Sequence, residues 1–335
     1  MSGSNETLVS GDECNPGRFT TLQIYSLVVH VMVFVLGVTG NGLVIWFCSF
    51  KVQKTVNTTW ILNLAIADFL FTSFLSLKIT YLALGNHWPF GKFMCSLVWF
   101  LSNLNLSVSV LQLMVISIDR CVCVYSPVWC KNHRRMRLAK IITAIIWVTS
   151  VLLCFPQFFF RITSRDKDKL YCRSNNDKSF KWNMVVRSIG LSVIFTTIVL
   201  CYAAIAVQVK RKHINLSSRP SKTFVIIIIS FFLCFFPYQI INLLEHFGIQ
   251  KFSGVNHTVR EIMLSLMIAN SCVNPILYIF IGRDFKERFC TSITSVFRKA
   301  FTEDAEMIDS RKKESSSESR MKSLEISQLY SSTQV

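Results

Sequence analysis

Residues 93–118, FMCSLVWFLSNLNLSVSVLQLMVISI, decide the fold, because they contain no Lys, Arg, Asp or Glu. About 20 apolar residues are enough for a helix to cross the hydrocarbon core of a bilayer. Six further stretches have the same character: residues 19–50, 55–82, 141–160, 189–209, 223–244 and 262–282. Only the stretch 55–82 is interrupted by charges, which are Asp68 and Lys78. Backbone polar groups in lipid must be satisfied within their own segment. The sequence therefore predicts an all-α bundle of seven transmembrane helices over residues 19–282.

The composition agrees with a membrane protein. The chain is 51% hydrophobic and 16% charged, whereas soluble domains average about 25% charged residues. Its net charge of +17 raises the question of nucleic acid, but a nucleic-acid binder gathers its basic residues on one soluble face. Here the basic residues fall in short clusters between apolar runs, so we expect no nucleic-acid partner.

The distribution of Lys and Arg predicts the orientation in the membrane. The connections 51–56, 121–140 and 210–222 are basic and contain no Asp or Glu, which indicates the cytoplasmic side. The polar segment 1–18 would then be extracellular, and its Asn5-Glu6-Thr7 triplet is an N-glycosylation acceptor. We expect a multi-pass plasma-membrane protein with its N-terminus outside.

The segment 161–187 opposes this orientation, since it would be extracellular and yet carries eight basic residues against three Asp. Charges late in the chain can lose to earlier signals. The excess positive charge is either a solvated surface or a means of attracting an anionic ligand.

The C-terminal region has two parts. Residues 283–298 carry Phe285, Phe289, Ile293 and Phe297 at every fourth position among charges, which predicts an amphipathic helix along the inner leaflet. Residues 299–335 are polar and predict a disordered cytoplasmic tail. Seven hydroxyl residues there are candidate phosphorylation sites for arrestin binding: Ser315, Ser316, Ser317, Ser319, Ser331, Ser332 and Thr333. The terminal residues 333–335 resemble a ligand for a PDZ protein.

Polar groups inside the spans point to a family. A charge within a span is a functional hypothesis by default, although Asn and Ser also serve as contacts between helices. The motifs are Gly40-Asn41, Leu64-Ala65-Ile66-Ala67-Asp68, Asp119-Arg120-Cys121, Trp147 and Asn274-Pro275-Ile276-Leu277-Tyr278. Together they resemble the rhodopsin family of G-protein-coupled receptors over roughly residues 20–298.

A narrower resemblance is to the chemoattractant receptors for formyl peptides, chemerin and prostaglandin D2. It rests on Asp119-Arg120-Cys121-Val122-Cys123-Val124, Pro127-Val128-Trp129, Asn132-His133-Arg134 and His87-Trp88-Pro89-Phe90-Gly91. The resemblance implies a receptor, not an enzyme, that couples to the inhibitory class of heterotrimeric G protein.

The resemblance also implies roles for single residues. Cys95 and Cys172 match the family's extracellular disulfide, against the alternative of two free thiols. Most of the other cysteines, Cys123 and Cys130 included, we expect to be free. Six positions match the family's sodium site: Asp68, Asn105, Ser109, Asn270, Ser271 and Asn274. The alternative there is a protonated Asp68 in a water-filled polar core, and no other cofactor is implied.

For coupling and switching, the matching residues are Asp119, Arg120, Tyr202, Phe235, Pro237, Asn274, Pro275 and Tyr278. Arg120 is expected to pair with Asp119 at rest and to meet the G protein when active. Phe235 stands where the family usually has Trp, and Ile194 and Ser76 stand where Pro is usual. These departures affect the geometry of the ligand pocket.

For the ligand we expect an anion, either a peptide with a free carboxylate or an acidic lipid. The expected contacts are Lys78, Ser102 and Arg187, since a cation inside a bundle needs a partner. The alternative for Lys78 is that it extends to the outer interface. Formyl-peptide receptors use an acid in the third span, where this chain has Ser102, Asn103 and Asn105.

Three other functions compete with signalling. A scavenging receptor would internalise ligand through arrestin without activating a G protein. A transporter is disfavoured because no internal repeat is evident. A retinal-based light sensor needs a Lys in the seventh span, and residues 262–282 contain none.

Overall fold

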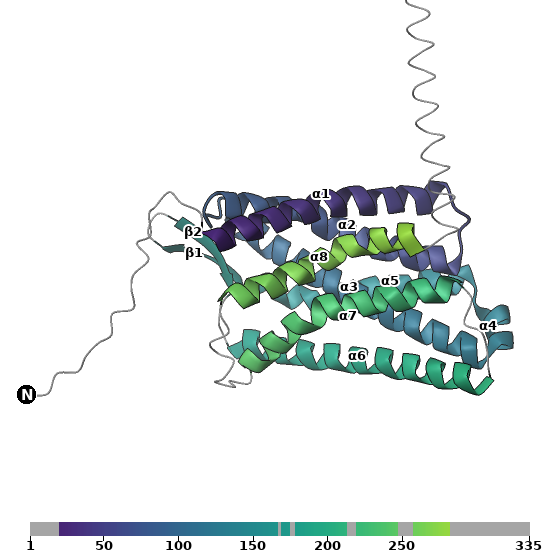
Figure 1. Ribbon diagram of the computed structural model, residues 1–335. Helices are drawn as coiled ribbons and strands as arrows, with labels where there is room; N and C mark the ends of the chain where they lie inside the picture. Colours follow the sequence, from purple (N-terminus) through teal and green to yellow (C-terminus); the bar gives the residue numbers. More distant parts are fainter. Residues whose placement is uncertain (1–19, 167–168, 175–177, 213–218, 247–256, 282–335) are drawn as a thin grey trace, which may run out of the picture. The chain divides into compact units, whose positions relative to one another are not determined.

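The computed structural model describes residues 20–166, 169–174, 178–212, 219–246 and 257–281 (Figure 1). Seven long helices in this part of the chain confirm the seven expected spans. They are α1 (Thr21–Phe50), α2 (Val56–Ala83), α3 (Gly91–Tyr125), α5 (Met136–Phe159), α6 (Lys178–Lys212), α7 (Arg219–His246) and α8 (His257–Ile281). The short helix α4 (Pro127–His133) and the antiparallel strands β1 (Arg161–Asp166) and β2 (Lys169–Ser174) complete it.

Local sequence explains where the first two helices begin. Thr20 caps α1, where its hydroxyl accepts a hydrogen bond from the Gln23 backbone and the Gln23 side chain accepts one from Thr20. Thr55 and Thr58 form the same reciprocal cap on α2. Such caps satisfy backbone N–H groups that have no partner within the helix.

Helix α5 shows how the bundle is adapted to lipid. It buries the small or polar residues Thr143, Ser150, Cys154 and Gln157. Its exposed side chains are large and apolar: Ile141, Ile145, Val148, Leu152, Phe155 and Phe159. A soluble helix has the reverse pattern. Five helices of the described chain are long and apolar enough to cross a membrane, and Val225–Ile241 in α7 is a shorter apolar segment.

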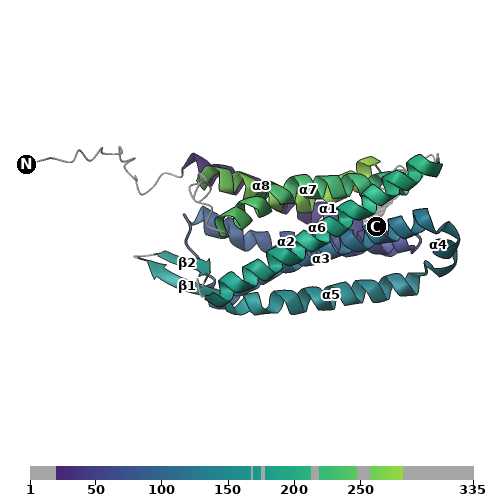
Figure 2. The ribbon, with the colours of Figure 1, turned by 90° about the horizontal axis from the view of Figure 1, so that it is seen from below.

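Helix α3 is central to the bundle, because it packs against α2, α5, α6, α7 and strand β1. Close approach of α1 to α2 depends on Gly37, where an added Cβ would lie 2.4 Å from Thr72 Cγ2. The hairpin β1–β2 lies at one end of the helices and α4 at the other, in both views (Figures 1 and 2). The two ends can therefore be treated as separate sites.

The structure confirms the helical fold and adds three details. The all-α description omits the hairpin, which occupies the first half of the basic segment 161–187. The last residues of that segment belong to a helix, because α6 begins at Lys178. The connection 121–140 is partly helical, since it contains the end of α3 and all of α4. The segments 1–18 and 283–335 lie outside the described residues.

Candidate functional site

A cavity of about 380 Å³ lies between α3, α6, α7 and α8, beside strand β1. Its polar lining includes Ser102, Asn103, Asn105, Ser109, Arg161, Arg187, Tyr238, Gln239, Arg260, Asn270 and Ser271. Three of the lining residues are arginines, and no Asp or Glu is among the described residues that line it. The cavity is therefore strongly positive. Ser102 and Arg187, both expected from sequence, are part of it.

Two of the arginines of the cavity, Arg161 and Arg187, contact neutral groups. Arg187 Nη1 donates a hydrogen bond of 2.6 Å to Asn103 Oδ1. The Arg161 guanidinium lies 3.4 Å from the centroid of the Trp99 ring, a cation–π contact. Within the described residues neither arginine forms an ion pair with a carboxylate. Burial lowers the pKa of Arg161 to about 10, against the opposing effect of Tyr238, so the Arg161 charge persists at neutral pH.

Strand β2 is fixed at the mouth of the bundle. A disulfide joins Cys95 of α3 to Cys172 of β2, as the resemblance implied. The Trp88 backbone donates a 2.8 Å hydrogen bond to the Leu170 carbonyl, and Lys169 Nζ donates one of 2.8 Å to the Gly85 carbonyl. These contacts hold the hairpin, and with it Arg161, in place beside the cavity.

The structure does not place Lys78 among the residues that line this cavity. Its Nζ lies 4.5 Å from the centroid of the Tyr81 ring. Glu261 of α8 is close enough to act on its charge, and Glu261 Oε2 accepts a 3.1 Å hydrogen bond from Ser26. Lys78 thus has an acidic neighbour inside the protein, and its role as a ligand contact stays a prediction.

Four of the six polar residues expected to hold sodium also line the cavity: Asn105, Ser109, Asn270 and Ser271. Asp68 and Asn274 do not line it, but they are linked to each other. Asn274 Nδ2 donates a 2.8 Å hydrogen bond to Asp68 Oδ2, and Asn105 Nδ2 donates one of 3.1 Å to Ser271 Oγ. Asp68 Oδ1 and Asn270 Oδ1 are buried and have no hydrogen-bond partner in the described part of the chain. Buried acceptors without donors are costly. One carboxylate with neutral oxygens and unpaired acceptors fits a hard monovalent cation.

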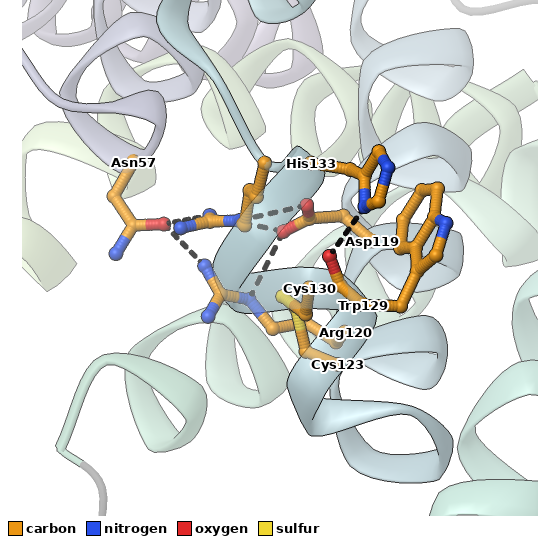
Figure 3. The surroundings of a disulfide bond; sticks show 8 residues. Asn57, Asp119, Arg120, Cys123, Trp129, Cys130 and His133 are labelled. Atoms are coloured by element: carbon orange, nitrogen blue, oxygen red, sulfur yellow. Dashed lines mark hydrogen bonds and ion pairs between the residues drawn. A yellow bond between two sulfur atoms is a disulfide. The ribbon is translucent and has the colours of Figure 1, made fainter.

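At the opposite end of the bundle, Asp119 is held by two arginines (Figure 3). Arg134 contacts both carboxylate oxygens of Asp119. Its Nε donates a hydrogen bond of 2.9 Å to Oδ1, and its Nη2 donates one of 3.0 Å to Oδ2. Arg120 Nε lies 3.8 Å from Asp119 Oδ2. Both arginines also donate to Asn57 Oδ1. The expected ion pair of Asp119 with Arg120 is present, and the closer pair with Arg134 was not expected from the sequence.

The same end contains a disulfide between Cys123 of α3 and Cys130 of α4 (Figure 3). We expected both cysteines to be free, and this expectation was wrong. The two residues are seven positions apart, and the turn at Ser126, followed by Pro127 at the start of α4, brings them together. Within α4, the Trp129 ring stacks on the His133 ring with centroids 4.9 Å apart.

One expected switching residue, Phe235 of α7, belongs to an aromatic cluster between α6 and α7. Phe235 stacks on Phe231 with centroids 5.4 Å apart, and Phe195 of α6 contacts both. Phe231 and Phe235 also line the cavity. A ligand in the cavity would therefore touch aromatic side chains that join these two helices, and Pro237 follows Phe235 by two residues in α7.

Sequence reasoning missed several residues of these two sites. Asn103, Arg161 and Arg260 line the cavity. Asn57 and Arg134, together with Asp119 and Arg120, form what we call the inner cluster. A signal for Asn103 was present, because residues 99, 102, 103 and 106 share one face of a helix. Other candidates lie outside the described residues: Asn5, the seven phosphorylation sites and the side chain of Tyr278.

Comparison with known proteins assigns the bundle. Residues 40–278 match the family described as the 7 transmembrane receptor (rhodopsin family). N-formyl peptide receptor 3 of Homo sapiens is 39% identical over 310 residues, which cover 86% of this chain and 88% of that protein. Formyl peptide receptor-related sequence 1 of Mus musculus is 37% identical over 308 residues, 85% of this chain and 87% of that protein. N-formyl peptide receptor 2 of Macaca mulatta is 37% identical over 309 residues, 86% and 88% of the two chains.

Proposed function

Because this chain belongs to the rhodopsin family of seven-transmembrane receptors, we propose that it recognises an extracellular anionic chemoattractant and activates a G protein of the inhibitory class. The ligand is a peptide with a free carboxylate or an acidic lipid. The N-terminus is extracellular, and the arginine-lined cavity faces outward.

The charge of the cavity is the observation that supports this ligand class. Arg161 and Arg187 present two positive charges whose nearest partners are the Trp99 ring and the Asn103 amide. A neutral partner leaves the charge of the guanidinium uncompensated, and a carboxylate would supply a charge-assisted bidentate partner. Relatives named formyl peptide receptors make a peptide the first candidate, because a peptide with an unmodified C-terminus carries one carboxylate.

The inner cluster supports coupling. Arg120 is held by Asp119 and Asn57, and Asp119 is shared with Arg134. In the resting packing these contacts keep Arg120 from a cytoplasmic partner. Agonist binding favours the second helix packing and the G protein favours the same one, so the two sites are coupled reciprocally. Sodium on Asp68 and Asn270 would supply a buried positive charge that stabilises the resting packing.

The experiment is a G-protein dissociation assay in transfected cells, screened with chemoattractant peptides and carboxylate lipids, each paired with its amide or ester. We expect activation by a free acid, a loss of at least tenfold in potency for its neutral derivative, and block by pertussis toxin. The variant Arg120→Ala should reach the surface and fail to couple. Arrestin recruitment without G-protein dissociation would instead identify a scavenging receptor, and activation by cationic amines would overturn the ligand class.

A further inference from the structure

A second cavity, of about 330 Å³, lies between α1, α2 and α5 at the end of the bundle that carries Asn57 and α4. It is separate from the arginine-lined cavity, with which it shares no lining residue. Its lining includes Lys54, Thr58, Thr59, Leu62, Lys140 and Thr143. The receptor function proposed above makes no use of it.

The cavity has a positive rim. Lys54, just before α2, and Lys140, in the first turns of α5, are both exposed and come from different elements. No Asp or Glu is among the described residues that line the cavity, and within them neither lysine forms an ion pair. Two ammonium groups facing one cavity without an acid favour an anion.

The interior of the cavity offers an unused hydrogen-bonding group. Thr143 is 7% exposed, and its Oγ1 has no hydrogen-bond partner in the described part of the chain. The neighbouring polar groups are already engaged. Thr59 Oγ1 donates to the Thr55 carbonyl at 2.9 Å, and Asn63 Nδ2 donates to the Thr59 carbonyl at 2.8 Å. A buried hydroxyl without a partner is unfavourable. The Thr143 hydroxyl is therefore available to donate a hydrogen bond to a molecule bound in the cavity.

The position of the cavity relates it to the membrane surface. Lys140 lies at the start of the apolar, exposed face of α5, between the exposed side chains of Leu138 and Ile141. On its N-terminal side lie the basic residues Arg134, Arg135 and Arg137. The rim is therefore at the boundary between the lipid-facing surface and the polar connections. Basic pockets between helices at the cytoplasmic surface suit phosphorylated lipid headgroups.

We propose that this cavity binds the phosphorylated headgroup of an anionic phospholipid from the inner leaflet. Lys54 and Lys140 contact the phosphate oxygens, and Thr143 donates a hydrogen bond to the headgroup. The choice of leaflet rests on the orientation given with the proposed function.

The test uses the full-length receptor purified in detergent and titrated with dioctanoyl phosphatidylinositol 4,5-bisphosphate, with bound lipid counted by native mass spectrometry. Dioctanoyl phosphatidylcholine tests the need for an anionic headgroup, and inositol 1,4,5-trisphosphate tests the need for acyl chains. The variants are Lys54→Ala with Lys140→Ala, and Thr143→Val, which keeps the shape and removes the hydroxyl. The matched control is Lys51→Ala with Arg137→Ala, which removes two nearby charges that do not line the cavity.

We expect the paired lysine variant to weaken phosphoinositide binding at least tenfold, Thr143→Val about threefold, and the control pair less than threefold. An equal loss of phosphoinositide affinity in the control pair would show that the effect comes from general surface charge, and it would rule out a specific site in this cavity. Equal binding of phosphatidylcholine would overturn it as well, and equally tight binding of inositol trisphosphate would replace the lipid by a soluble phosphate. The titration contains no agonist, so the two proposals are tested independently. A negative result for the lipid does not affect the proposed agonist class, and a negative result in the agonist assay does not affect lipid binding.

Discussion

The two ends of the bundle use arginine in opposite ways. At the hairpin end, Arg161 and Arg187 contact a Trp ring and an Asn amide, both neutral. At the α4 end, Arg120 and Arg134 share one carboxylate, Asp119. The first pair has no carboxylate partner among the described residues, whereas one of the two positive charges of the second pair is neutralised by Asp119.

This difference determines how much each arginine can gain from a new partner. An arginine with a neutral partner gains most when an external carboxylate arrives. An arginine that already binds a carboxylate gains little from another, and it must give up its partner to act elsewhere. Under the proposed function, the hairpin end is thus the outer, ligand-binding end, and the α4 end is the inner end, where Arg120 must leave its partners on activation.

The disulfides give the largest expected contrast. The outer bridge joins residues 77 positions apart and the inner one residues seven apart. By loop-closure entropy the outer bridge contributes about 4–5 kcal/mol and the inner one about 2–3 kcal/mol. We predict that Cys95→Ser and Cys172→Ser each abolish agonist binding, and that the double variant is no worse.

Agonist binding on intact cells, normalised to surface expression, measures this effect. Cys201→Ser is the control, because Cys201 is free and lies on α6. Normal binding by either outer variant would remove the bridge from the ligand site.

The next prediction compares the cations of the outer end. Truncating one partner of a desolvated charge pair costs about 2–5 kcal/mol, which is roughly thirtyfold or more in affinity. We predict this loss for Arg187→Ala, with no further loss when the acid of the agonist is amidated. Lys78→Ala should cost less, because Lys78 lies by Tyr81 near Glu261 and outside the cavity lining.

Competition binding with the free-acid and amidated agonists measures both effects. Arg173→Ala is the matched control, since that guanidinium lies over the Tyr171 ring, 4.7 Å from its centroid. A larger loss for Lys78→Ala than for Arg187→Ala would move the anion site away from the arginine-lined cavity.

How much of this was predictable depends on the range of the interactions. The spans follow from local composition, because lipid imposes the same length and apolarity on each. The pair Asp68 and Asn274 was also expected together, although 206 residues separate them, because family motifs mark both positions. Neither prediction required knowledge of side-chain geometry.

The remaining features depend on contacts that composition does not encode. That Arg161 would sit beside α3 depends on the hairpin register and the bridge to Cys95. That Arg134 would bind Asp119 depends on the turn from α4 into α5, and the Asn132-His133-Arg134 motif marks the residue without indicating its partner. The Cys123 and Cys130 pair was missed because cysteines near the cytoplasm are normally free.

A smaller effect should separate the two arginines of the inner end. Removing Arg134 frees Asp119 from its bidentate partner and weakens the contact through Asn57. Both groups are partly exposed, so the loss in the resting packing is modest. We predict that Arg134→Ala raises agonist-independent G-protein activation about two- to fivefold, whereas Arg135→Ala leaves it unchanged. Basal dissociation at matched surface expression is the measurement, and unchanged or lower basal activity for Arg134→Ala would show that Arg134 does not restrain the resting state.

The smallest expected effect concerns the inner disulfide. In a reducing cytoplasm a Cys123–Cys130 bridge opens, while Asp119 and Arg134 continue to join the two ends of the same connection. The short loop also makes the entropic contribution of the bridge the lesser of the two. We therefore predict that Cys130→Ser couples like the wild type in cells. In purified receptor kept oxidised, the variant should unfold at a temperature lower by at most a few degrees, and dithiothreitol should remove that difference.

The outer disulfide provides the comparison. Dithiothreitol applied to intact cells should abolish agonist binding in the wild type and in the Cys130→Ser variant alike. If Cys130→Ser fails to couple in cells whose cytoplasm is reducing, the inner end depends on its disulfide as much as the outer end does. The proposed difference between the two ends would then be wrong.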